Sequence, residues 1–159
     1  MTTTNPYLGL RASALETPRG ELDLHVEDPT LPWGVLTEIG FDKGTATIVA
    51  FADGNASLYW SSGGGSIGGF RVPSVRDAAK ACVEVAGELV GEMHSASAFP
   101  LPVDGEVIFY ARTDAGVIAA SAPEDDLAGG QHALSPLFYA AQAVITAYRE
   151  IEASETGHN

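Results

Sequence analysis

A glycine-dense segment carries the clearest chemical pattern in the chain. Gly63, Gly65 and Gly68 spell G-x-G-x-x-G, the spacing of loops that hold the pyrophosphate of a dinucleotide. Gly64, Ser66 and Gly68 spell G-x-S-x-G, the spacing around the nucleophilic serine of many hydrolases. Both patterns follow a predicted strand, so Gly64, Gly65, Ser66 and Gly68 are the candidate ligand-binding residues of the sequence.

The surroundings of this segment argue against both kinds of chemistry. Each motif needs a turn that leads directly from a strand into a helix, whereas the next predicted helix is capped by Ser74, six residues after Gly68. The strands before it read as an antiparallel meander rather than a parallel unit. The chain order Ser66, an aspartate, then His132 is formally available for a hydrolase. Ser66 and His132 are therefore the catalytic candidates of an alternative reading, a hydrolase or a small-molecule-binding protein.

Metal-ligating residues are sparse. The four histidines, His25, His94, His132 and His158, have no i, i+4 spacing that would place two of them on one helix face. The single cysteine, Cys82, excludes an intrachain disulfide and reads as a small core residue. We expect no metal and no cofactor.

The overall charge narrows the choice of partners. The 159 residues include 8 Lys and Arg against 21 Asp and Glu, which gives a net charge of −13. Such a chain repels nucleic acids and anionic membrane surfaces, so neither is expected as a partner. No signal peptide is recognisable, and no apolar run approaches the ~20 residues of a membrane span. A cytoplasmic location is therefore expected.

Hydrophobic periodicity predicts a meander of three strands, at residues 34–41, Thr45–Ala52 and Ala56–Ser61. The turn Asp53-Gly54-Asn55 joins the second to the third. A helix from Ser74 to His94 follows, with Ser74 as its N-cap. Strands at Glu106–Arg112 and Val117–Ser121 and a helix at Pro136–Glu152 complete the pattern. At the N-terminus a short helix over Tyr7–Glu16 is possible, with Leu8, Ala12 and Leu15 on one face.

The last helix is apolar almost all round, because only Gln142 and Thr146 are clearly polar between Leu137 and Tyr148. One side should cover the sheet, and the other should meet a second copy or lie under the N-terminal segment. In the middle helix, Gly87 and Gly91 lie one turn apart, which indicates either a close approach of another backbone or a frayed end. The candidate interface residues are Phe138, Ile145, Tyr148, Gly87 and Gly91.

The element order resembles two classes of small dimeric proteins. The order α-β-β-β-α-β-β-α, together with the acidic charge and the length, is similar to that of type III secretion chaperones, which implies a homodimer that binds an extended effector segment. The profilin-like roadblock and longin-type domains are also similar and imply a dimeric scaffold, although their usual order has two strands before the middle helix and three after it. Either resemblance covers residues 34–152, rests on no diagnostic motif and transfers no residues.

These observations predict a single α+β domain at residues 34–153, preceded by an extended segment at 1–33 and followed by a loose tail at 154–159. A five-stranded antiparallel sheet, in the order β-β-β-α-β-β-α, packs against the two main helices. The expected function is a non-catalytic, chaperone-like protein-binding or scaffolding domain, a homodimer that also binds another protein.

Overall fold

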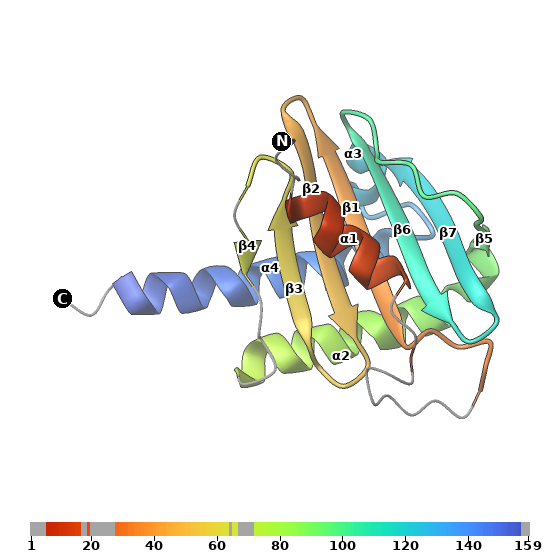
Figure 1. Ribbon diagram of the computed structural model, residues 1–159, viewed down its shortest axis with the longest axis horizontal. Coiled ribbons are helices and arrows are strands. Elements are labelled where there is room, and N and C mark those ends of the chain that lie inside the picture. The colour runs from red at the N-terminus through yellow and green to blue at the C-terminus, as the bar shows by residue number, and fades with distance from the viewer. Residues whose placement is uncertain (1–5, 17–18, 20–27, 64, 67–71, 157–159) are drawn as a thin grey trace, which may run out of the picture.

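A seven-stranded antiparallel sheet forms the centre of the molecule (Figure 1). The computed structural model describes residues 6–16, 19, 28–63, 65–66 and 72–156. The strand order is β4-β3-β2-β1-β6-β7-β5. The five predicted strands are the long ones, β1 Gly34–Phe41, β2 Gly44–Phe51, β3 Ala56–Trp60, β6 Glu106–Thr113 and β7 Gly116–Pro123. Two-residue strands, β4 at Gly65–Ser66 and β5 at His94–Ser95, line the two edges of the sheet.

The central strand is β1, which is buried along nearly its whole length. Gly34 pairs with Phe51 in β2 on one side and with Arg112 in β6 on the other. Because side chains alternate along a strand, Val35 joins the core on one face of the sheet and Leu36 joins the core on the opposite face. The sheet therefore has two covered faces.

Two long helices, α2 at Pro73–Glu88 and α4 at Ser135–Thr156, cover one face and pack against each other. Their buried side chains and those of the underlying strands make the larger core, in which Val75, Phe109 and Leu137 are fully enclosed. The short helix α3 at Glu124–Ala128 connects β7 to this layer. This arrangement confirms the predicted α+β architecture of a sheet with two main helices.

The middle helix differs from its prediction at both ends. Its N-cap is Val72, whose aliphatic side chain cannot make a cap hydrogen bond, and the predicted N-cap Ser74 lies inside the helix, after Pro73. The helix ends at Glu88, and a single 3-10 turn, η3 at Val90–Glu92, leads into β5. The chain thus leaves the helix between Gly87 and Gly91, where the low helix propensity of glycine favours an end. His94, predicted as helical, pairs with β7 instead.

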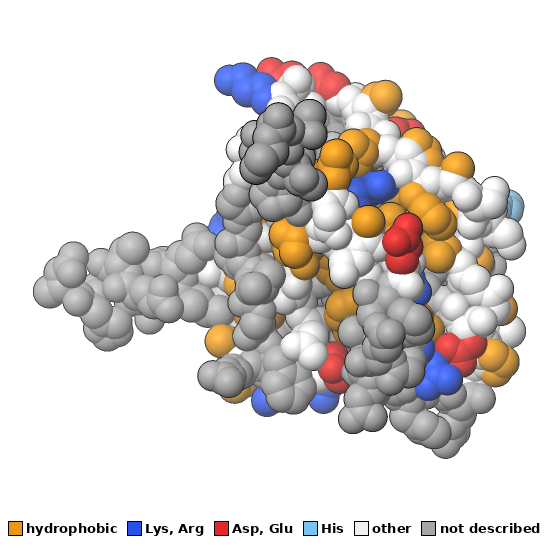
Figure 2. Space-filling model, in the orientation of Figure 1, with side chains coloured by type: hydrophobic (Ala, Val, Ile, Leu, Met, Phe, Trp, Pro, Cys, Tyr) orange, Lys and Arg blue, Asp and Glu red, His pale blue; other side chains and the backbone are white. Residues whose placement is uncertain are grey.

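A third helix, α1 at Pro6–Glu16, lies on the opposite face of the sheet (Figure 1). The predicted apolar face was wrong, because Leu8 is 50% exposed. The buried positions are Tyr7, Arg11, Ala14 and Leu15. Figure 2 shows this side of the molecule, with hydrophobic side chains gathered near its centre. Of the predicted face, Leu15 is buried, and the buried polar contact of Arg11 takes the place expected for Leu8.

The last helix extends to Thr156, beyond the predicted Glu152 and into the segment predicted as a tail. Its N-terminal Ser135 donates its hydroxyl to the Leu127 carbonyl (2.9 Å), so this side chain ties α4 to α3. Among the residues that the structure describes, no helix combines the length and apolar character that a membrane crossing requires.

Candidate functional site

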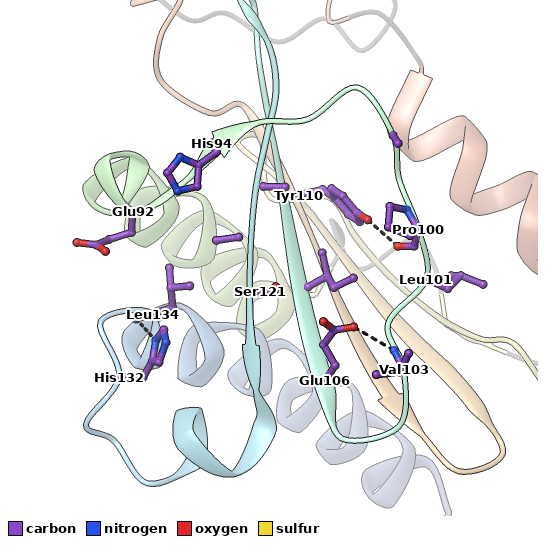
Figure 3. A pocket seen from close by; sticks show the side chains of 14 residues that line it. Glu92, His94, Pro100, Leu101, Val103, Glu106, Tyr110, Ser121, His132 and Leu134 are labelled. Atoms are coloured by element: carbon purple, nitrogen blue, oxygen red, sulfur yellow. Dashed lines mark hydrogen bonds between the residues drawn. The ribbon is translucent and has the colours of Figure 1, made fainter.

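A groove of about 640 Å³ follows β7 at the edge of the sheet. Its floor is the sheet face at Ile108, Tyr110, Ala119 and Ser121. The segment 96–105, here called the arch, runs from β5 back to β6 and forms one wall. Figure 3 shows the arch residues Pro100, Leu101 and Val103 on one side of β7, and Glu92, His94 and His132 on the other.

The outer edge of β7 is only partly paired. β5 pairs with Ile118 and Ala119, and in the described part of the chain no strand continues this pairing toward Pro123. Hydrogen bonds to a neighbouring antiparallel strand alternate along the chain. The Glu124 amide donates to the Gly105 carbonyl (2.8 Å), which fixes that alternation for the β6–β7 pair. The N–H and C=O of Ser121 therefore point away from β6, into the groove.

The rim of the groove combines apolar and acidic side chains. Leu101 is 41% exposed and Val103 is 69% exposed, so both offer apolar side chains at the rim. Glu106 accepts a hydrogen bond from the Val103 amide (3.1 Å) and so holds the end of the arch. Adjoining hollows are lined by Asp104 on one side and by Asp125 and Asp126 on the other.

His132 lies in the loop before α4 and lines the groove. Its Nδ1 accepts a hydrogen bond from the Leu134 amide (3.0 Å), so the ring orientation is fixed and Nε2 is the nitrogen left for a ligand. No three His, Cys, Asp or Glu side chains lie close enough to hold a metal ion within the described ranges.

The arch is anchored by Arg11 of α1. This guanidinium donates through Nη2 to the carbonyls of Phe99 (2.7 Å) and Pro100 (3.3 Å). The Tyr110 hydroxyl donates to the same Pro100 carbonyl (2.6 Å; Figure 3). Helix α1, on the face of the sheet, therefore holds the wall of the groove in place.

Arg11 is itself held by a buried carboxylate in the central strand. Glu38 is 0% exposed and receives Nε (2.8 Å) and Nη2 (2.7 Å) of Arg11 on its two oxygens. The Thr47 hydroxyl donates to Glu38 (2.7 Å), so the Tyr7 hydroxyl must donate to Thr47 (2.5 Å). Such a network compensates the cost of burying a charge.

The network shifts the ionisation of its members. Burial alone would lower the pKa of Arg11, but the hydrogen bond and the charge of Glu38 outweigh it and raise that pKa. Burial, with the Glu38 charge as the next cause, raises the pKa of Tyr110 to about 12. Arg11 therefore stays charged and Tyr110 stays neutral across the physiological range, which keeps both anchors of the arch intact.

The structure does not bring the two catalytic candidates together. Ser66 belongs to β4, at one edge of the sheet, while His132 lies beside Ser121 of β7 near the other edge. Five strand intervals separate β4 from β7, or about 24 Å at the usual strand spacing. Ser66 also occupies an antiparallel strand, and residues 67–72 separate it from α2. The serine-hydrolase arrangement is therefore absent from these two residues.

The remaining ligand-binding candidates are placed in part. Gly65 pairs with Tyr59 as the first residue of β4. Gly64 and Gly68 lie outside the described residues. Neither Gly65 nor Ser66 is at a helix N-terminus, the position at which such glycines would bind a phosphate.

The candidate interface residues are mostly committed to the chain's own core. Phe138, Ile145 and Tyr148 are each 4–6% exposed, and the Tyr148 hydroxyl donates to the Ala56 carbonyl (2.7 Å). Gly87 faces the side chains of Leu31 and Pro32 at ordinary contact distance, and a second hollow of about 580 Å³ lies beside it. In the described part of the chain, nothing beyond its own chain neighbours lies within 4 Å of the position that a Gly91 side chain would take. The described residues thus bring no backbone of another element close to either glycine.

Sequence reasoning missed the residues that shape the groove. Neither Arg11 nor Glu38 was singled out from the sequence, although a glutamate in an otherwise apolar central strand was a signal that a cation must meet it. The groove itself depends on where β5 ends, and a two-residue strand has no sequence signature.

Comparison of the chain with models of protein families, with curated proteins and with solved structures finds no match. The architecture defines an α+β protein without an assigned family.

Proposed function

We propose that this protein is a non-catalytic protein-binding domain that holds an extended segment of a partner protein in the groove beside β7. The observation that carries the proposal is the outward-facing backbone of Ser121 at an edge where the strand ladder is incomplete. An extended segment can complete such a ladder, with main-chain hydrogen bonds for affinity and side-chain contacts for selectivity. Leu101 and Val103 on the arch would contact the apolar side chains of that segment.

A proline substitution tests this binding mode. Because the amide of Ser121 points away from β6, Ser121→Pro removes a donor at the edge without removing a hydrogen bond from the β6–β7 pair. Pro123, two residues further along β7, already occupies a position whose backbone nitrogen faces away from β6. Ser121→Ala, which keeps the amide and loses the hydroxyl, is the matched control.

The binding assay uses octapeptides selected from a random displayed library against the wild-type protein and then resynthesised. Ser121→Pro should weaken their binding about tenfold, the effect of losing one hydrogen bond and introducing a steric obstacle, while Ser121→Ala changes it less than about twofold. Urea unfolding midpoints of both variants verify that the fold is retained. Selected peptides that bind Ser121→Pro as well as wild type would refute pairing at this edge.

Self-association is the second part of the proposal. Since Phe138, Ile145 and Tyr148 pack inside the chain, a homodimer through α4 would use the outer side of that helix, where Tyr139 is 48% exposed. Native mass spectrometry reports the state directly. A dimer that dissociates in Tyr139→Glu, a change at an exposed position, would support this interface, and a purely monomeric wild type would exclude it.

A further inference from the structure

We infer that the segment bound beside β7 is basic, with Lys or Arg at the positions that face the groove rim. This inference rests on the proposed function and names the chemistry of its partner. Carboxylates surround the open edge, with Glu92 and Glu106 in the groove and Asp104, Asp125 and Asp126 in the adjoining hollows. Among the described residues, no Lys or Arg lines any of these three hollows.

The distribution of the cations makes this edge different from the hollow beside α2. The hollow beside α2 has Lys80 together with Glu84 and Glu88, so its charges are mixed. The charged residues that line the groove are all acidic. The floor has small side chains at Ala119 and Ser121, which leaves room for long side chains of a bound segment to reach the rim. A surface of one sign attracts segments of opposite sign and rejects those of like sign.

The occupant cannot be a segment of this chain itself. The chain has only 8 Lys and Arg among 159 residues, and no two of them are adjacent. A second copy with a net charge of −13 would be repelled from an acidic edge. The groove therefore fits a different protein that presents an extended basic segment.

Three synthetic octapeptides provide the test, with Thr alternating with Lys, Gln or Glu. Isothermal titration calorimetry is carried out with the full-length protein at about 50 and 500 mM NaCl, salt concentrations between which exposed charge interactions are strongly screened. The Lys peptide should bind at least tenfold more tightly than the Gln peptide at low salt, and the Glu peptide should not bind. High salt should remove most of the preference.

A pair of variants separates local from overall charge. Glu92→Gln, Asp125→Asn and Asp126→Asn together remove three carboxylates beside β7. Asp77→Asn, Glu84→Gln and Glu150→Gln together remove three exposed carboxylates from α2 and α4, so both proteins have the same net charge. The first variant should bind the Lys peptide about tenfold more weakly, and the second less than about twofold.

The outcomes distinguish this inference from the proposed function. If library peptides bind in a manner sensitive to Ser121→Pro but the Lys and Gln peptides bind equally, the groove binds segments and the basic preference is refuted. If both charge variants weaken binding equally, the attraction is general and the inference is again refuted. If Ser121→Pro leaves binding of the Lys peptide unchanged, that peptide does not pair with β7 and the inference is refuted, whereas the proposed function fails only if the library peptides are equally insensitive.

Discussion

Breaking the buried pair of Arg11 in α1 and Glu38 in β1 should lower the free energy of unfolding by an unusually large amount for a single substitution. Arg11 donates to both oxygens of a carboxylate that is 0% exposed in the central strand. Replacing Arg11 with Met leaves that carboxylate with the Thr47 hydroxyl but without its counter-charge. Removing one partner of a buried pair costs about 3–5 kcal/mol, a large part of the ~5–15 kcal/mol that stabilises a typical domain.

A second arginine pair in the same chain supplies the control. Arg19 donates to Asp114 (2.7 Å), but the two side chains are 31% and 28% exposed. Solvent screens a pair exposed to that extent, so Arg19→Met should lower the free energy of unfolding far less than Arg11→Met does. The comparison holds the substitution constant and contrasts a buried arginine, which also donates to the Phe99 and Pro100 carbonyls, with a partly exposed one.

Urea unfolding followed by tryptophan fluorescence measures both free energies of unfolding, and hydrogen exchange reports whether α1 detaches first. The double variant Arg11→Met with Glu38→Met should recover more than half of the loss, because both buried charges are then gone. Equal, small losses for Arg11→Met and Arg19→Met would refute the reasoning, as would unchanged protection of the α1 amides.

Three further predictions concern single positions. Gly40→Ala should destabilise the protein by about 3 kcal/mol in urea unfolding, because the new side chain would overlap the Val103 carbonyl. Gly9→Ala, which meets none of the described residues within 4 Å outside its own helix backbone, should instead add about 1 kcal/mol through helix propensity. Cys82 is buried, which raises its pKa to about 12, so thiol reagents should label it only after unfolding; rapid labelling of the native protein would contradict this. Tyr110 ordinarily titrates at 10.0 and here at about 12, so the unfolded chain loses this proton first, and stability should fall as the pH rises from 10 to 12, less steeply in Tyr110→Phe.

The long strands and their order along the chain could be predicted because the sequence patterns that indicate them are local. The apolar stretch of β2 and the turn at Gly54, which has a φ of +96°, are legible from a few consecutive residues. The end of α2 was misjudged because the amphipathic pattern continues past Glu88 while the backbone turns away at the glycines. Periodicity records which side chains are apolar, not where the chain stops being helical.

The face of α1 and the groove were not predictable for a different reason. Leu8 is the natural apolar anchor of an isolated helix, yet it lies half exposed because the partner of Arg11 is 27 positions away in sequence. The open backbone at Ser121 likewise depends on β5 beginning only at His94, which pairs with Ala119. Contacts between distant segments decided both features, and a single sequence does not record them.

The pairing of β1 with β6 has a consequence for how the protein is made. Gly34 lies opposite Arg112, so the edge of β1 that pairs with β6 stays unpaired until residues that leave the ribosome much later are synthesised. During that interval the β1–β2–β3 meander exposes an apolar strand, β1, with an unpaired edge. Such an edge can associate with other nascent chains. Helix α1, which emerges first, can cover one face of the meander but not that edge. Efficient production should therefore depend on how quickly the second half of the sheet is synthesised.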